Sequence, residues 1–264
     1  MYEIFDAHAH IYPDKIASKA ALAIGDFYHI EMDCNGSVAG LLALGKEAGV
    51  SRYLVHSVAT TPHQVKSINR FLLEQITLHP EFIGFMTLHQ DLTFDEIDEE
   101  VTFCIKHGFH GIKLHPDFQK FAIDSPEGRK MYDAVNGRLP ILFHTGDRRY
   151  NFSHPTQLAA VAKDYPKSYF IGAHFGGYSC WRESEEAYKG LDNVYFDTSS
   201  SLAFLPPEEA SRLIHSMGAE KFFFGSDYPM WKPKEEVERL LKLTLTEKER
   251  EGIFAGNLKA FLSL

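Results

Sequence analysis

The segment IFDAHAHIY, residues 4–12, decides between the two fold classes that suit this chain, a barrel and an open sheet. Its β-branched and aromatic residues predict a short strand. A dinucleotide-binding open sheet would carry a glycine-rich phosphate loop directly after this strand, but HAHIYPDK occupies that place. In a strand, residues two apart point to the same face, so His8 and His10 should project together near its carboxyl end. The segment therefore favours a barrel that carries a site at this end.

Seven more stretches have the composition of short strands. They are 52–59, 82–89, 111–116, 140–146, 169–176, 194–200 and 222–229. From the second onward they recur about every 25–35 residues with a helical stretch between them, which is typical of parallel βα units. The chain has 264 residues, close to the roughly 250 that a (β/α)8 barrel needs. We therefore predict a (β/α)8 TIM barrel with its site at the carboxyl-terminal face of the strands, and a single domain over 1–264.

Helices are predicted between the strands. They cover 37–48, 63–78, 95–107, 126–137, 155–164, 207–217 and 234–243. Ser37 is expected to cap the first, and Pro126, Pro155 and Pro207 to open three others. The stretch 12–36 is expected to be a long loop over the barrel mouth. An extra carboxyl-terminal helix is expected over 246–262, because Thr246 and Glu249 form a capping-box pattern.

Composition excludes several classes of protein. The net charge of −9 argues against nucleic acid as a partner, since phosphate binding needs a basic face. No run of roughly 18 apolar residues suggests a membrane span. The amino-terminal residues are acidic where a signal peptide would be basic, so a cytoplasmic location is expected. The three cysteines, Cys34, Cys104 and Cys180, are expected to be reduced because their number is odd and their spacing wide.

Polar residues recur at the ends of the predicted strands, where a packed barrel interior should carry Val, Ile and Leu. They are His56, His89, Lys113, His115, His144, His174, Asp197, Ser199 and Asp227. Burying so many polar groups is costly unless they are paired or bind something. Three imidazoles, His8, His10 and His144, together with the carboxylate of Asp227, would make an open site for one divalent metal. This ligand set favours zinc and also suits manganese, iron or cobalt.

The motifs at the strand ends also resemble a known family. FDAHAHIYP, GIKLHPDFQ, ILFHTGD, NVYFDTSS and FFFGSDYP occur in the order found in the amidohydrolase superfamily, as does the long segment 153–177. The chain is most similar to the branch of small metal-dependent hydrolases that includes aminocarboxymuconate-semialdehyde decarboxylase. The resemblance spans the first strand to the last. It implies that His8, His10, His144 and Asp227 bind the metal, and that His174 is an acid–base group or a ligand of a second metal.

The resemblance leaves the reaction open. The first hypothesis is hydrolysis of a small amide, lactone or ester by a metal-activated water, with Asp227 and His174 as catalytic groups. The alternative is a non-oxidative decarboxylase or hydratase of a small unsaturated or aromatic acid. A non-catalytic barrel is disfavoured because all four ligands are present. In some relatives a lysine on the fourth strand is carboxylated and bridges two metals, so Lys113 and His174 could serve a second metal.

Other residues near the mouth receive weaker hypotheses. His115, Arg148 and Arg149 are candidates for binding substrate, since guanidinium groups suit a carboxylate. Asp197 is expected either to orient an imidazole or to make a local turn hydrogen bond. Tyr228 and Trp231 would form an apolar wall or pack under a loop. The expected partner is a small-molecule substrate. A homodimer is suggested only by the oligomeric states that are common for this fold.

Overall fold

Eight short strands form the framework of the protein. The computed structural model describes residues 2–264, and the strands form one sheet in the order β1-β2-β3-β4-β5-β6-β7-β8. Their bounds are β1 Ile4–His10, β2 Val50–His56, β3 Phe82–Thr87, β4 Gly111–Leu114, β5 Ile141–Phe143, β6 Phe170–Gly172, β7 Val194–Asp197 and β8 Phe222–Phe223. Helices follow the strands in alternation. This order confirms the predicted (β/α)8 class.

Several strands are shorter than the predicted stretches. β5 ends at Phe143, β6 at Gly172 and β8 at Phe223. His144, His174 and Asp227 therefore lie in the segments that follow these strands. The difference arises because a polar residue can directly follow a strand without taking part in the backbone hydrogen bonds of the sheet.

Seven predicted helices are present, with ends close to the predicted ones. They are α2 Val38–Ala48, α3 Gln64–Leu78, α4 Phe94–Lys106, α6 Pro126–Val135, α7 Pro155–Asp164, α9 Pro207–Met217 and α10 Pro233–Leu241. The Ser37 hydroxyl accepts a hydrogen bond from Gly40 N at 3.1 Å, as expected of a cap. Two short helices were not predicted, α5 Pro116–Gln119 and α8 Trp181–Ala187, and a 3-10 turn, η1, spans Ala219–Lys221.

One sequence expectation is wrong. The stretch 12–36 is not a loop throughout, because α1 spans Asp14–Tyr28. The buried residues of α1 are Ala17, Ala21 and Gly25, which recur every fourth position. Since this buried face consists only of small residues, it lacks the periodic large apolar side chains by which an amphipathic helix is usually detected.

The expected carboxyl-terminal helix is present in three parts. They are α11 Glu247–Glu251, the π-helical segment η2 Gly252–Gly256, and α12 Asn257–Leu262. Thr246 and Glu249 form the predicted capping box: Glu249 N donates to the Thr246 hydroxyl at 3.2 Å, and Thr246 N donates to the Glu249 carboxylate at 2.7 Å.

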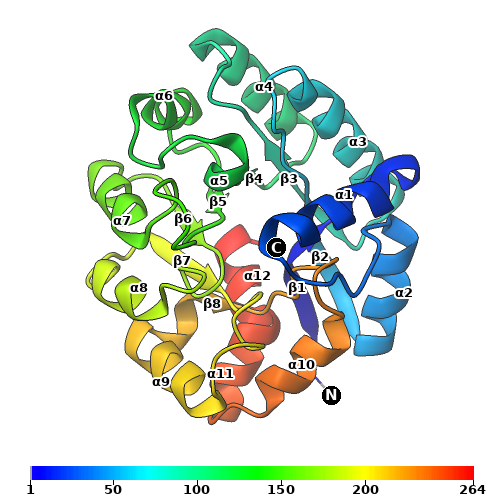
Figure 1. Ribbon diagram of the computed structural model, residues 1–264, viewed down its shortest axis with the longest axis vertical. Coiled ribbons are helices and arrows are strands. Elements are labelled where there is room, and N and C mark those ends of the chain that lie inside the picture. The colour runs from blue at the N-terminus through cyan, green and yellow to red at the C-terminus, as the bar shows by residue number, and fades with distance from the viewer. Residues whose placement is uncertain (1) are drawn as a thin grey trace. The chain divides into compact units, whose positions relative to one another are not determined.

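The chain divides into two compact units. The first comprises Met1–His56 and Asp197–Leu264, so it combines the first and last parts of the chain, drawn blue to light blue and yellow to red in Figure 1. Within it β1 pairs with β2, and His10 lies opposite His56. The second unit is Ser57–Phe196, in which β3 to β7 pair in parallel. Apolar strand residues form the core, as their near-complete burial shows.

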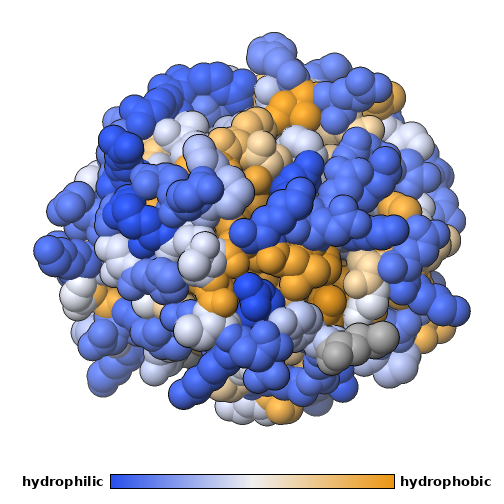
Figure 2. All heavy atoms as spheres, turned by 90° about the horizontal axis from the view of Figure 1, so that it is seen from below, coloured by the Kyte–Doolittle hydropathy of each residue, from blue (hydrophilic) through white to orange (hydrophobic). Residues whose placement is uncertain are grey.

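One face of the molecule carries both hydrophilic and hydrophobic side chains, with hydrophobic ones gathered near its centre in Figure 2. On the face drawn in Figure 2, hydrophilic side chains dominate and hydrophobic ones lie exposed between them, as on most folded proteins. Within residues 2–264, no helix has both the length and the apolar character needed to cross a membrane.

Candidate metal centre

Three histidines of the first unit form a buried cluster. His8 and His10 lie on β1, two residues apart, and His56 ends β2. Each offers one ring nitrogen, and these nitrogens lie within 4.8 Å of one another. The His56 ring meets the other two edge-on, with centroids 4.8 Å from His8 and 4.3 Å from His10. The predicted pair is thus joined by a third imidazole, which the sequence had left without a role.

Asp227 lies beside this cluster. Its Oδ1 is 3.4 Å from His8 Nε2 and 3.5 Å from His10 Nε2. These distances exceed the usual donor–acceptor distance of a hydrogen bond. Two ligands of one tetrahedral ion, each bonded at about 2.1 Å, stand about 3.4 Å apart. The chemistry and spacing of these donors therefore fit a divalent metal, and the predicted ligands His8, His10 and Asp227 are brought together.

The backbone around Asp227 is held against β1. Ala7 N donates to Phe224 O at 2.7 Å, and Asp227 N donates to His8 O at 2.9 Å. A side chain at Gly225 would place its Cβ 3.0 Å from His8 Cβ, so it would push β1 away by a few tenths of an ångström, and glycine favours the close approach. Asp227 has a φ of 59°, in the left-handed region that residues other than glycine seldom adopt. Such backbone is common at functional sites.

Asp197 orients His8. Its Oδ2 lies 2.8 Å from His8 Nδ1, and both side chains are buried. Because a carboxylate accepts, this contact holds the proton on Nδ1 and leaves the Nε2 lone pair directed toward Asp227. Asp197 Oδ1 also accepts from Ser199 N at 3.1 Å. Both expectations for Asp197 therefore hold: it orients an imidazole and makes a local turn hydrogen bond.

Asp6 ties the same strand to the Asp227 segment. Its Oδ1 accepts from Ser226 N at 2.9 Å, and its Oδ2 accepts from the Ser226 hydroxyl at 2.5 Å. Burial raises the pKa of Asp6 to about 7, although the hydrogen bonds from Ser226 oppose this rise. Asp6 thus connects β1 to the segment that carries Asp227 through two hydrogen bonds.

A second histidine cluster lies in the other unit. His144 follows β5, and His174 lies in the turn after β6 with a φ of 61°. His144 Nδ1 is 3.0 Å from His174 Nε2. His115 stacks between two rings, with centroids 4.1 Å from His144 and 3.7 Å from Phe118. The structure thus brings His144, His174 and His115 together, and it holds the ring of His115 flat against His144.

Asp117 belongs to this second cluster, although the sequence analysis did not name it. Its Oδ2 lies 3.8 Å from His144 Nε2 and accepts from the Ser153 hydroxyl at 2.6 Å. Asp117 Oδ1 is buried without a hydrogen-bond partner, and burial raises the pKa of the carboxyl to about 7. The sequence signal was the acid two residues after His115 in the motif GIKLHPD.

The other predicted residues have defined surroundings. Lys113 is fully buried on β4, and its carbonyl accepts from the Thr87 hydroxyl at 3.2 Å. Arg148 and Arg149 both form ion pairs: Arg148 Nη2 lies 2.5 Å from the carboxylate of Glu183, and Arg149 Nη2 lies 2.7 Å from that of Asp147. A substrate carboxylate would have to compete with these acids for either guanidinium.

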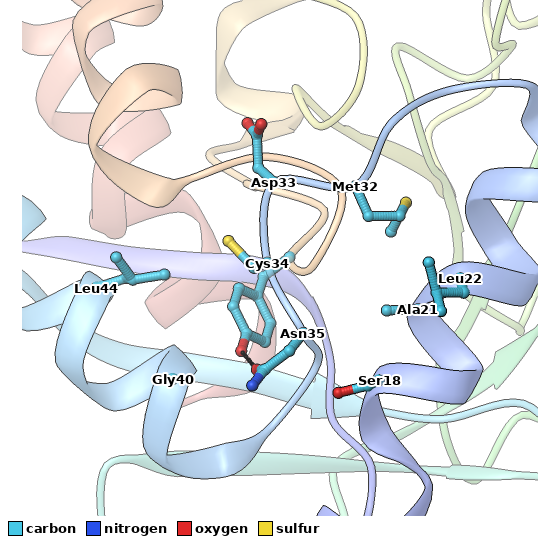
Figure 3. Close-up of a pocket in the computed structure, with 10 residues that line it drawn as sticks. Ser18, Ala21, Leu22, Met32, Asp33, Cys34, Asn35, Gly40 and Leu44 are labelled. Atoms are coloured by element: carbon cyan, nitrogen blue, oxygen red, sulfur yellow. Dashed lines mark hydrogen bonds between the residues drawn. The ribbon is translucent and has the colours of Figure 1, made fainter.

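A separate cavity of about 560 Å³ lies in the first unit. It is bordered by α1, by α2 and by the segment 32–35 (Figure 3), and Tyr228 also lines it. The Tyr228 hydroxyl donates to Ser37 O at 2.9 Å. None of the predicted metal ligands lines this cavity. Tyr228 is therefore a packing residue that faces α1 and α2.

Comparisons with known proteins agree with the fold. The family model described as Amidohydrolase matches residues 5–264. A 5-carboxyvanillate decarboxylase from Sphingomonas paucimobilis is 13% identical with a TM-score of 0.78, covering 100% of both chains. A TIM-barrel protein from Bordetella bronchiseptica is 16% identical with a TM-score of 0.81, covering 99% of this chain and 98% of its own.

A third solved structure is a dihydroxybenzoic acid decarboxylase from a Polaromonas species, with bound manganese and 2-nitroresorcinol. It is 17% identical with a TM-score of 0.75, covering 100% of this chain and 98% of its own. At such identities the structures show a shared fold. A comparison with curated proteins finds no match.

Proposed function

Since this chain belongs to the amidohydrolase family, we propose that it is a metal-dependent, non-oxidative decarboxylase of a small aromatic or unsaturated carboxylic acid. The observation that carries the metal dependence is the convergence of Asp227 Oδ1 on His8 Nε2 and His10 Nε2, at 3.4 and 3.5 Å. All three side chains are largely buried, and such a group of donors is costly unless it binds something.

Decarboxylation is preferred over hydrolysis because of the similar structures. The proteins from Sphingomonas and Polaromonas are decarboxylases of substituted benzoates, and each matches this chain over nearly its whole length. Hydrolysis of an amide, lactone or ester, the first hypothesis from the sequence, has no comparable support. The substrate class therefore follows the alternative hypothesis.

We propose that one divalent metal is held by His8, His10 and Asp227, with His144 as the fourth ligand that the family pattern implies. The bound manganese of the Polaromonas protein supports a divalent ion, and the preference for zinc stays a prediction. A second metal at Lys113 and His174 also stays a prediction. When bound, the metal would supply positive charge that holds and polarises the oxygens of the substrate.

The chain's own residues would position groups and move a proton. Asp197 holds the proton on His8 Nδ1, and Asp117 faces His144 Nε2. In the reaction the bond between carbon and carboxylate breaks, carbon dioxide leaves, and the electron pair stays on the substrate carbon. A proton must then reach that carbon, and His174, the predicted acid–base group outside the proposed ligand set, is proposed to deliver it. Asp227, which would bind the metal as a carboxylate, has no proton of its own to give.

The reaction class can be tested with purified protein loaded with Mn²⁺ or Zn²⁺. A panel of hydroxybenzoates and unsaturated acids is assayed for released carbon dioxide, and a panel of esters, lactones and amides for hydrolysis. We expect carbon dioxide from at least one acid. Hydrolysis in the second panel without any carbon dioxide from the first would overturn the decarboxylase proposal and restore the hydrolase.

The metal site is tested separately with His10→Ala and Asp227→Ala. Both variants should lose bound metal and activity together, as measured by elemental analysis and the same assay. His63→Ala, which removes an exposed histidine before α3, should keep both. Activity retained by protein that contains no metal would refute the metal proposal.

A further inference from the structure

A serine holds one oxygen of Asp227. Ser200 follows β7, is buried, and has its hydroxyl oxygen 2.5 Å from Asp227 Oδ2. The other oxygen, Oδ1, is the one that lies near His8 Nε2 and His10 Nε2. The two carboxylate oxygens therefore face different partners, and the hydrogen bond from Ser200 fixes the rotation of the carboxylate about its last bond.

Trp231 occupies an acceptor position of the same Ser200 hydroxyl, which donates to Asp227 because a carboxylate can only accept. Its indole Nε1 lies 2.9 Å from the Ser200 oxygen. An indole N–H can only donate, so Ser200 must accept from it and has one proton left to give. The other acceptor in reach is the sulfur of Met230 at 3.3 Å, which is a weak acceptor. The proton of Ser200 is therefore directed to Asp227 Oδ2.

The Trp231 ring is itself held from two sides. Phe204 meets it edge-on at a centroid distance of 5.9 Å and an angle of 76°. The guanidinium carbon of Arg239 lies 5.4 Å from the ring centroid, and the guanidinium contacts the carboxyl groups of Glu236 and Glu235 of the same helix. These two contacts restrict the orientation of the indole whose N–H donates to Ser200.

We propose that Trp231 is a positioning residue, which acts through Ser200 to present Asp227 Oδ1 to the divalent metal. The proposal rests on the proposed function, because it assumes that Asp227 is a metal ligand. The indole N–H of Trp231 then takes part in the hydrogen bonds that hold a metal ligand, whereas the sequence suggested only an apolar wall or packing under a loop. The direct consequence of the proposal is that removal of the indole N–H should weaken metal binding while leaving every ligand in place.

The test is a double-mutant cycle on metal affinity, measured by titrating metal-free protein with Mn²⁺ or Zn²⁺ in the presence of a competing chelator. Trp231→Phe keeps an aromatic ring but removes the donor, and should raise the metal Kd about tenfold, as loss of a group behind a ligand often does. Ser200→Ala should raise it at least as much. The double variant should bind no more weakly than Ser200→Ala, because Trp231 acts only through Ser200. A purely structural contribution of Trp231 would instead add to that of Ser200.

Controls keep the outcomes distinct. Trp181→Phe makes the same chemical change on α8 and should leave the metal Kd unchanged. If Trp231→Phe does not fold, Phe204→Ala replaces it; Phe204 is 46% exposed, and its loss loosens the indole but keeps the N–H. That variant should weaken metal binding in the parent and not in the Ser200→Ala background.

Two results would overturn the proposal that Trp231 positions Asp227 through Ser200. One is a metal Kd for Trp231→Phe within about twofold of the parent, and the other is additive effects in the double-mutant cycle. A parent protein that binds no divalent metal would instead refute the proposed function, and this proposal with it.

Discussion

At the scale of single residues, two buried carboxylates at the histidine cluster of the first unit differ in position: one points at the cluster and the other lies behind it. Asp227 is of the first kind, with Oδ1 directed at His8 and His10. Asp197 is of the second kind, with its contact at the far nitrogen of His8. Groups behind the ligands set the tautomer and the angle of the rings, so their removal should affect metal binding without removing a ligand.

Replacement of Asp197 by asparagine should weaken metal binding by about 10- to 100-fold, because an amide no longer favours the proton on His8 Nδ1 as a carboxylate does. The Kd is measured by competitive titration. Asp26→Asn, a matched change at an exposed position of α1, should have no effect. Equal affinities for the parent and the Asp197 variant would contradict the orienting function of this carboxylate.

Glu236 is a buried carboxylate outside the proposed ligand set. One of its oxygens pairs with Arg239, and its Oε2 has no hydrogen-bond partner. The pKa of Glu236 is raised to about 8, mainly by burial and to a smaller extent by the charges of Asp227 and Asp6, while Arg239 opposes the rise. Because its pKa is higher in the folded chain than in the unfolded chain, the folded protein holds the proton more tightly. Its contribution to stability is therefore largest at low pH and falls as the pH rises.

Replacement of Glu236 by glutamine should remove this pH dependence. Between the ordinary pKa of 4.5 and the folded value of about 8, the parent should lose stability relative to the variant by up to about 1.4 kcal/mol per pH unit. Urea unfolding of metal-free protein at several pH values measures this difference. Parallel stability curves for parent and variant across this range would show that Glu236 is ionised in the fold.

At the scale of elements, α1 is the longest of the three helices that local pattern did not predict. Its packing depends on small residues, since a Cβ at Gly25 would come within 2.7 Å of Ile30 O and Ala17 and Ala21 are buried. The helix also lines the 560 Å³ cavity through Ser18, Ala21 and Leu22 (Figure 3). Close packing of this kind tolerates added volume poorly.

Ala17→Leu, at a buried position of α1 that does not line the cavity, should therefore destabilise the protein by about 1–3 kcal/mol through overpacking. Ala23→Leu adds the same atoms on the exposed side of α1 and should change the free energy of unfolding by less than about 0.5 kcal/mol. Chemical denaturation of both variants provides the comparison. Equal effects at the two positions would mean that α1 does not pack through its small residues.

At the scale of the whole molecule, a metal bound to the folded chain but not to the unfolded chain should stabilise it by mass action. At a free metal concentration of 100 times Kd, the gain is about 2.7 kcal/mol. Chelation should accordingly lower the Tm by several degrees, measured by calorimetry with and without a chelator. Asp227→Ala should show no such difference. An unchanged Tm in the parent would argue against a metal held by buried ligands.

The sequence by itself determined the strand and helix order, because strand-like runs and helical stretches alternate at a regular spacing. It also identified His8, His10 and Asp227 as neighbours, since residues two apart on a strand share a face and parallel strands end at the same edge. The contacts of His144 with His174 follow from the same rule. These inferences need only local periodicity and strand order.

Only the tertiary structure decided which side chains stand behind these histidines. Asp197 contacts His8, 189 residues away, and Asp117 contacts Ser153, 36 residues away. The two hydrogen bonds that Ser200 makes with Trp231 and Asp227 likewise join the segment after β7 to the segment after β8. Such pairs leave no periodic signal, because each depends on rotamers and loop paths that form only when the chain packs. The sequence therefore indicates where the site lies, and packing determines how each of its groups is held.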